Sequence, residues 1–161
     1  MNHTDSKHEL ELTTPGDREI VMKRVFDAPR ARVFDAFTKP ELIKRWLLGP
    51  DGWSMPICEV DLRVGGRYHY VWRNDADASE FGFNGAYREI DEPDRIVHVE
   101  SMDGNPGEAL VTTTFVERNG STTVTMTIRH ESREVRDMVI ETGMAEGVGR
   151  SYQRLDDVLA G

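Results

Sequence analysis

The sequence predicts an α+β fold in which a curved antiparallel sheet of seven strands wraps around one long C-terminal helix, with two short helices after the first strand. Three observations predict it. Short runs rich in β-branched residues, separated by turn residues, fill positions 57–130. A single apolar stripe with helical spacing occupies positions 133–159. Two short helical patterns, separated by a proline, follow a strand-like run at positions 19–26.

The length and composition are typical of one globular domain. At 161 residues the chain can bury a substantial core but is short for two domains. Residues 1–17 are polar, end at Pro15-Gly16 and show no hydrophobic period, so we expect a flexible tail before a single domain at 18–161. No apolar run approaches the roughly 18 residues of a membrane span. No signal peptide pattern is present either, and we expect a cytoplasmic protein without membrane insertion.

Charge and cysteine content exclude several classes of function. The formal net charge of -9 repels phosphate backbones, and the arginines form no basic stripe, so nucleic-acid binding is not expected. Cys58 is the single cysteine, which excludes an internal disulfide and a multi-cysteine metal site. With no histidine or lysine beside it in sequence, Cys58 is interpreted as a small buried apolar residue.

The first strand and the two short helices have clear boundaries. The strand at 19–26 stops at Asp27-Ala28-Pro29. Helical spacing then begins, breaks at Lys39-Pro40 and resumes over 41–47, which predicts two helices joined at the proline. Residues 48–56 are expected to form a loop.

The central segment predicts six consecutive strands. Asn119-Gly120 is the strongest hairpin signal, because it joins two strands rich in threonine and apolar residues. Consecutive hairpins make an antiparallel meander, to which the strand at 19–26 adds a seventh member. The turns are expected at Gly65-Gly66, 74–77, 91–94, 103–107 and Asn119-Gly120.

The strand after Gly65-Gly66 is unusually aromatic. Tyr68, Tyr70 and Trp72 share one parity, so on a strand they point to the same side of the sheet. There they can fill a core or line a cavity for an apolar ligand, and the pattern does not distinguish the two.

The C-terminal stripe predicts one long amphipathic helix that covers the sheet. Gly143, Gly147 and Gly149 lie inside it, which indicates a bend or a close approach. A bend could border a pocket, and close helix-to-sheet packing explains the glycines equally well. The stripe consists of Val135, Met138, Thr142, Ala145, Val148, Tyr152, Leu155 and Leu159.

This order of elements is the helix-grip arrangement, and several motifs carry a family resemblance over residues 18–159. The chain resembles the SRPBCC superfamily of START-like and Bet v 1-like domains, and more narrowly the homologues of the C-terminal domain of the activator of Hsp90 ATPase. The matching motifs are Phe26-Asp27-Ala28-Pro29 with Val33-Phe34, Pro40-Glu41-Leu42 with Trp46, Gly49-Pro50, Asp61-Leu62-Arg63 with Gly65-Gly66-Arg67-Tyr68, Gly85-Ala86-Tyr87-Arg88-Glu89-Ile90, Pro93-Asp94-Arg95-Ile96-Val97 and Gly143-Met144-Ala145-Glu146-Gly147.

The resemblance implies a fold and a choice of functions. Superfamily members bind apolar molecules between sheet and helix, some cyclise polyketides there, and the eukaryotic namesake stimulates a chaperone ATPase. Many relatives carry tryptophan where this chain has Leu47 and Val148. Both differences reduce aromatic bulk, which could enlarge the cavity. We expect no counterpart of the additional N-terminal domain of the eukaryotic activator, and therefore no full chaperone-stimulating activity.

A search for catalytic motifs gives no catalytic residues, no cofactor fingerprint and no metal site. Nucleophile, zinc and phosphate-loop motifs are missing from the sequence. His69, His98 and His130 lie on separate strands without ligand spacing. His69 has the outward parity, whereas His130 could sit at a cavity mouth as a hydrogen-bonding group.

Three hypotheses from different classes follow. The first is a binding module for a small apolar or aromatic molecule. The second is an enzyme of polyketide cyclase or hydrolase type, with a tyrosine or His130 as acid or base, which needs a titratable group of perturbed pKa in the cavity. The third is a chaperone-accessory interaction domain, which needs an exposed apolar patch. The expected ligand-binding residues are Trp46, Trp53, Met55, Tyr68, Tyr70, Trp72, Phe83, Tyr87, Phe115, Met126, Met144, Val148 and Tyr152, with Thr113 and His130 as further polar anchors.

Overall fold

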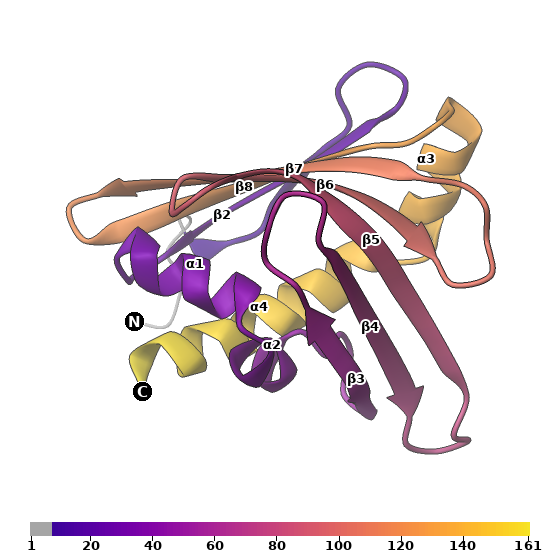
Figure 1. Cartoon of the computed structure of the whole chain (residues 1–161), viewed down its shortest axis with the longest axis horizontal. Helices are drawn as coiled ribbons and strands as arrows, with labels where there is room; N and C mark the ends of the chain where they lie inside the picture. The colour runs from indigo at the N-terminus through magenta and orange to yellow at the C-terminus, as the bar shows by residue number, and fades with distance from the viewer. Residues whose placement is uncertain (1–7) are drawn as a thin grey trace.

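In the computed structural model, which describes residues 8–161, the chain forms eight strands and four helices (Figure 1). None of the helices in this part of the chain is long and apolar enough to cross a membrane. In chain order the elements are β1 (Glu11–Thr13), β2 (Glu19–Phe26), α1 (Arg30–Thr38), α2 (Pro40–Trp46), β3 (Trp53–Val60), β4 (Arg67–Asn74), β5 (Glu80–Asp91), β6 (Arg95–Met102), β7 (Ala109–Arg118), β8 (Ser121–Arg129), α3 (Arg133–Glu141) and α4 (Met144–Ala160).

All eight strands belong to one antiparallel sheet in the order β1-β2-β8-β7-β6-β5-β4-β3. The six-strand meander is therefore confirmed, with β2 closing onto β8. The turn between β7 and β8 pairs Arg118 with Ser121 across Asn119-Gly120, whose φ angles of 54° and 80° are both positive. A two-residue hairpin turn of this type needs positive φ angles at both central residues, which Asn and Gly adopt at low cost.

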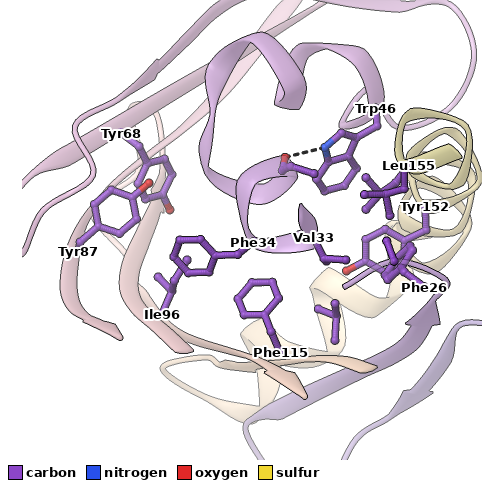
Figure 2. Close-up of a cluster of buried hydrophobic side chains, with 14 residues drawn as sticks. Phe26, Val33, Phe34, Trp46, Tyr68, Tyr87, Ile96, Phe115, Tyr152 and Leu155 are labelled. Atoms are coloured by element: carbon purple, nitrogen blue, oxygen red, sulfur yellow. Dashed lines mark hydrogen bonds between the residues drawn. The ribbon is translucent and has the colours of Figure 1, made fainter. Parts of the chain in front are cut away.

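The helices α1, α2 and α4 lie on one side of the bent sheet (Figure 1). We call the sheet face toward these helices the inner face. Figure 2 shows how Phe34 of α1, Phe115 of β7 and Tyr152 of α4 point into a shared core. Phe34 and Phe115 meet edge to face at 5.4 Å between ring centroids. The same cluster includes Tyr68 of β4, Tyr87 of β5 and Ile96 of β6, so one core extends across the inner face.

The prediction of seven strands is wrong, because β1 pairs with β2 and adds an eighth. This strand lies in the segment expected to be a tail, of which residues 1–7 fall outside the described part. Leu12 of β1 sits opposite Met22 and packs against a buried cluster. Three residues are too few to show a period of two, so the sequence pattern gave no signal for this strand.

The loop expected at 48–56 is also shorter than predicted, since β3 starts at Trp53. Its pairing with β4 is interrupted between Ser54 and Ile57, where the register shifts. Pro56 lies inside this interruption. A proline cannot donate a ladder hydrogen bond, which explains both the irregular pairing and the misleading loop signal.

The C-terminal segment is two helices instead of one. Gly143 adopts a left-handed conformation with φ 80° and separates α3 from α4. A non-glycine residue would be strained there, so the glycine allows the direction change. The bend that the glycines indicated is real, but it is a full break at one of them. Gly147 and Gly149 continue α4.

Candidate functional site

The aromatic residues of β4 do share the inner face, as predicted. The rings of Tyr68 and Tyr70 lie 4.9 Å apart between centroids, and those of Tyr70 and Trp72 lie 5.9 Å apart. Tyr87 of β5 joins them, 5.6 Å from Tyr68 (Figure 2). We call Tyr68, Tyr70 and Tyr87 the tyrosine cluster.

Several residues expected to line a cavity pack in the core. The Trp46 indole donates a hydrogen bond of 2.9 Å to the carbonyl of Ala36, drawn as a dashed line in Figure 2. The Trp72 indole donates to the carbonyl of Leu47 at 2.7 Å. Both tryptophans therefore have a structural role, and their contact with a ligand stays a prediction. The buried members of the expected set are Trp46, Met55, Tyr68, Trp72, Tyr87, Thr113, Phe115 and Tyr152.

A second group of expected residues is only half-buried. Tyr70 and Phe83 face each other across β4 and β5, and Met126 lies on β8 of the same face. Met144 and Val148 belong to α4, where Val148 packs against two separate core clusters. Each of these five residues keeps part of its surface exposed.

The two remaining expected residues lie at strand ends. Trp53 is half-buried at the start of β3, where it packs against the cluster of Met55 and Trp72 and its ring meets Phe81 at 5.3 Å. His130 follows β8 and is half-buried, with its Nε2 enclosed and without a hydrogen-bond partner. Burial, followed by the charge of Arg136, lowers the pKa of His130.

Glu100 of β6 is a functional candidate that the sequence analysis missed. It is half-buried on the inner face and accepts a hydrogen bond of 2.8 Å from the Tyr68 hydroxyl. Burial raises the pKa of Glu100, and the hydrogen bond from Tyr68 partly opposes this shift. A carboxyl group held in apolar surroundings can bind a cation or exchange a proton.

His98 lies two residues before Glu100 on the same strand and face. Its ring meets Tyr68 edge to face at 5.2 Å and lies 6.2 Å from Tyr87. The Nδ1 atom is enclosed and has no hydrogen-bond partner. Burial lowers the pKa of His98 to about 4, so the imidazole is uncharged at neutral pH.

The neighbours of Glu100 across the sheet are small. Gly85 of β5 and Ala109 of β7 are its register partners. A Cβ at Gly85 would lie 2.7 Å from the Tyr68 hydroxyl oxygen, so only glycine lets Tyr68 reach Glu100. The hydrogen and methyl side chains of these two partners do not cover the carboxyl group, and Tyr68 reaches it from the next strand.

Among the described residues, none of the groups that shift the pKa of Glu100 is a cation. The two buried arginines bond elsewhere: Arg24 to Asp156 at 2.7 Å, and Arg136 to Asp137 at 2.8 Å. Around Glu100 the other titratable groups are held neutral. Burial raises the pKa values of the three clustered tyrosines, and it raises the pKa of Cys58, opposite Tyr70, to about 11.

The reason Glu100 and His98 escaped detection is the composition of β6. Ile96 has the inward parity, but Val97 and Val99 have the opposite one, so the strand is apolar on both parities. Alternation therefore could not assign a face. The turn at 91–94 did not supply the missing signal, because the register shifts between Tyr87 and Glu89, and this irregularity places His98 opposite the inward-facing Tyr87.

A polar hollow lies over the opposite parity of these strands, with a volume of about 380 Å³. Asp103 accepts hydrogen bonds there from Asn84 at 2.7 Å and pairs with His69 at 2.8 Å, which confirms the outward direction of His69. Of the expected site residues only Tyr68 borders this hollow. Residues 8–161 contain no group of three side chains suited to hold a metal ion.

A bent antiparallel sheet with two short helices after an early strand and a long C-terminal helix defines the helix-grip class of α+β domains. The family model described as activator of Hsp90 ATPase homolog 1-like protein matches residues 27–160. The chain belongs to this family, within the SRPBCC superfamily. A search among curated proteins gave no match.

Solved structures from bacteria share the fold. A protein from Rhodobacter sphaeroides is 29% identical, with 94% of this chain and 98% of that chain covered and a TM-score of 0.89. A protein from Chromobacterium violaceum is 25% identical, with 89% and 98% covered and a TM-score of 0.79. An AHSA1-like protein from Aeromonas hydrophila, 22% identical over 87% and 93% of the chains, has a TM-score of 0.73.

Proposed function

We propose that the protein binds a small apolar or aromatic molecule on the inner face, between β4, β5 and β6 on one side and α4 on the other. The observation that carries this proposal is the half-burial of Tyr70 and Phe83 on the inner face and of Val148 on α4. Large apolar side chains of this kind are more often fully buried. A bound apolar molecule would remove their remaining surface from water.

The character of the lining supports the proposal. α4 packs mainly against α2, and also against α1 and α3, and Val148 on it stays half-buried. The tyrosines offer flat apolar surfaces with polar edges, which suit a ring-shaped guest. Met126 and Met144 add flexible side chains that adapt to its outline.

The test is the binding of an uncharged aromatic probe, naphthalenemethanol, to the whole protein and to a filled variant. Val148→Trp places a large ring between α4 and the sheet, and should weaken binding by at least about tenfold, or 1.4 kcal/mol. The matched control is Val116→Trp on an exposed site of β7, which should leave affinity unchanged. The proposal fails if the probe does not bind, or if both variants bind it as the parent does.

An enzyme of cyclase or hydrolase type is the second candidate, favoured by one specific observation. The inner face carries both a carboxyl group of raised pKa, Glu100, and an uncharged imidazole, His98. Acid–base catalysis uses a carboxyl group and an imidazole that lie on one face and can exchange protons with a substrate. Turnover of a bound aromatic ketone, lost in both Glu100→Gln and His98→Phe, would establish this function.

The chaperone-accessory role has the family description as its support. The large exposed apolar side chains of the described surface come from several separate strands and loops, and only Val135 and Met138 share one helix, α3. Val135 is 37% exposed and Met138 62%. Two residues one turn apart make a small patch, so this observation does not favour the role over ligand binding.

A further inference from the structure

We infer that the ligand of the inner face carries an amine, and that the ammonium group binds Glu100 within the tyrosine cluster. This inference rests on the proposed binding function and names its ligand class. It predicts a preference for cationic guests over neutral or anionic guests of the same shape. The anchoring residues are Glu100, Tyr68 and Tyr70, with His98 at the border.

The first argument is the unbalanced charge of Glu100. A carboxylate with reduced hydration is costly unless a cation or several donors compensate it. Tyr68 supplies one hydrogen bond, and both buried arginines are bound to other carboxylates. An ammonium group has three donors and the opposite charge, so it satisfies what the protein leaves unsatisfied.

Aromatic rings lie beside Glu100. The ring centroids of Tyr70 and Tyr87 are 4.9 Å and 5.6 Å from that of Tyr68. Tyr68 and Tyr87 are buried, whereas Tyr70 is half-buried and offers its ring to a guest. The negative faces of aromatic rings attract alkylammonium groups, especially where a carboxylate assists. Phe83, opposite Tyr70, continues this aromatic surface and can hold the apolar body of the guest.

The third argument is accessibility. Gly85 and Ala109 flank Glu100 on both neighbouring strands, and neither has a side chain that can cover the carboxyl group. The absence of a Cβ at Gly85 also lets Tyr68 lean toward Glu100, which fixes one carboxylate oxygen. The second oxygen remains for the guest.

The charges around Glu100 disfavour an anionic guest. An anionic guest would approach a carboxylate, and its nearest imidazole, His98, carries no charge at neutral pH. The chain as a whole carries a formal charge of -9, which also disfavours anions. Fatty acids and aromatic carboxylates are therefore poor ligands for this face.

The experiment compares three probes with the same ring: naphthylmethylamine, naphthalenemethanol and naphthoate. At neutral pH, calorimetry should show the amine binding at least about tenfold more tightly than the alcohol, with the acid weakest. The difference should persist in about 1 M salt, where the Debye length falls to about 3 Å and the general attraction of an acidic protein is screened.

Glu100→Gln provides the decisive variant, because its amide oxygen still accepts the Tyr68 hydrogen bond while the charge is lost. It should reduce the amine preference to near equality and leave the affinity for the alcohol unchanged. Glu59→Gln is the matched control, since it removes the same charge from the opposite side of the sheet. This control should keep the full preference.

Tyr70→Leu tests the aromatic part independently and should weaken amine binding more than alcohol binding. If the alcohol and the amine bind equally in the parent protein, the amine inference is overturned while the proposed binding function stands. If none of the three probes binds, both are overturned. An amine preference that survives Glu100→Gln and disappears in high salt would also overturn the inference, because it would reflect net charge alone.

Discussion

Among the described residues, Glu100 and His98 are polar groups with unusual surroundings. The Glu100 carboxyl accepts a hydrogen bond of 2.8 Å from a tyrosine, and His98 has an enclosed Nδ1 without a partner. A domain selected for stability alone would favour apolar residues at both positions. The retention of two polar groups at the centre of an apolar face is the expected signature of a site that recognises a polar atom.

The imidazole of His98 makes the stability of the fold pH-dependent. Its pKa is lowered from 6.5 to about 4 by burial, so the unfolded chain takes up a proton first when the pH falls. The contribution of His98 is fully present above pH 6.5 and is lost as the pH falls toward 4. His98→Phe should therefore lose less stability between these limits than the parent, by up to about 3 kcal/mol.

Urea denaturation of both proteins near the two limits measures this difference directly. Unequal slopes of unfolding free energy against pH, with the shallower slope in the variant, are the expected result. Equal losses of unfolding free energy in the parent and in His98→Phe would contradict this prediction. They would mean that the imidazole keeps its ordinary pKa in the folded state and is well hydrated.

Among the elements, the strands and short helices were largely predictable and the connections between them were not. The alternation over Tyr68, Tyr70 and Trp72 gave the correct face for β4, and the helical break at Pro40 was correct. The strand β6 was not assigned a face, because apolar residues occupy both of its parities. Its contribution to the site depends on pairing with β5, which is a property of two elements together.

The break between α3 and α4 shows a second limit of pattern analysis. The apolar stripe keeps its helical spacing from Thr142 to Ala145, across Gly143, so periodicity alone predicts one helix. The break comes from the left-handed backbone at Gly143, and helical periodicity says nothing about the sign of φ. Three glycines were candidates for a bend, and the sequence gave no reason to choose among them.

Replacing two glycines of this segment by alanine should change the stability of the fold in opposite directions. Gly143→Ala puts a Cβ on a left-handed residue and should destabilise the fold by about 1 kcal/mol or more. Gly149→Ala lies within α4, where a Cβ meets nothing within 4 Å, and should stabilise it by roughly 0.5 to 1 kcal/mol. Thermal unfolding of the two variants measures both effects. Equal shifts of the same sign would contradict the assignment of the break to Gly143.

For the whole molecule, one core extends across the inner face of the sheet. Phe34, Phe115 and Tyr152 share this core with Tyr68 and Tyr87, and its packing explains most of the expected aromatic residues without a ligand. Tyr70 packs against the core but stays half-buried, as does Glu100 beside Tyr68. The sequence predicted that the face would be aromatic, but which rings are core and which remain half-exposed depends on where the helices lie.

Mapping a bound amine by NMR tests the central claim, that the inner face is the binding site, most directly. Naphthylmethylamine is added to the labelled protein, and the methyl signals of Met126, Met144 and Val148 are followed together with those of Val64 and Val116, which are exposed. The signals of Met126, Met144 and Val148 should shift and reach saturation, whereas those of Val64 and Val116 should not shift. Shifts confined to Val64 and Val116, or no saturable shift at all, would contradict it.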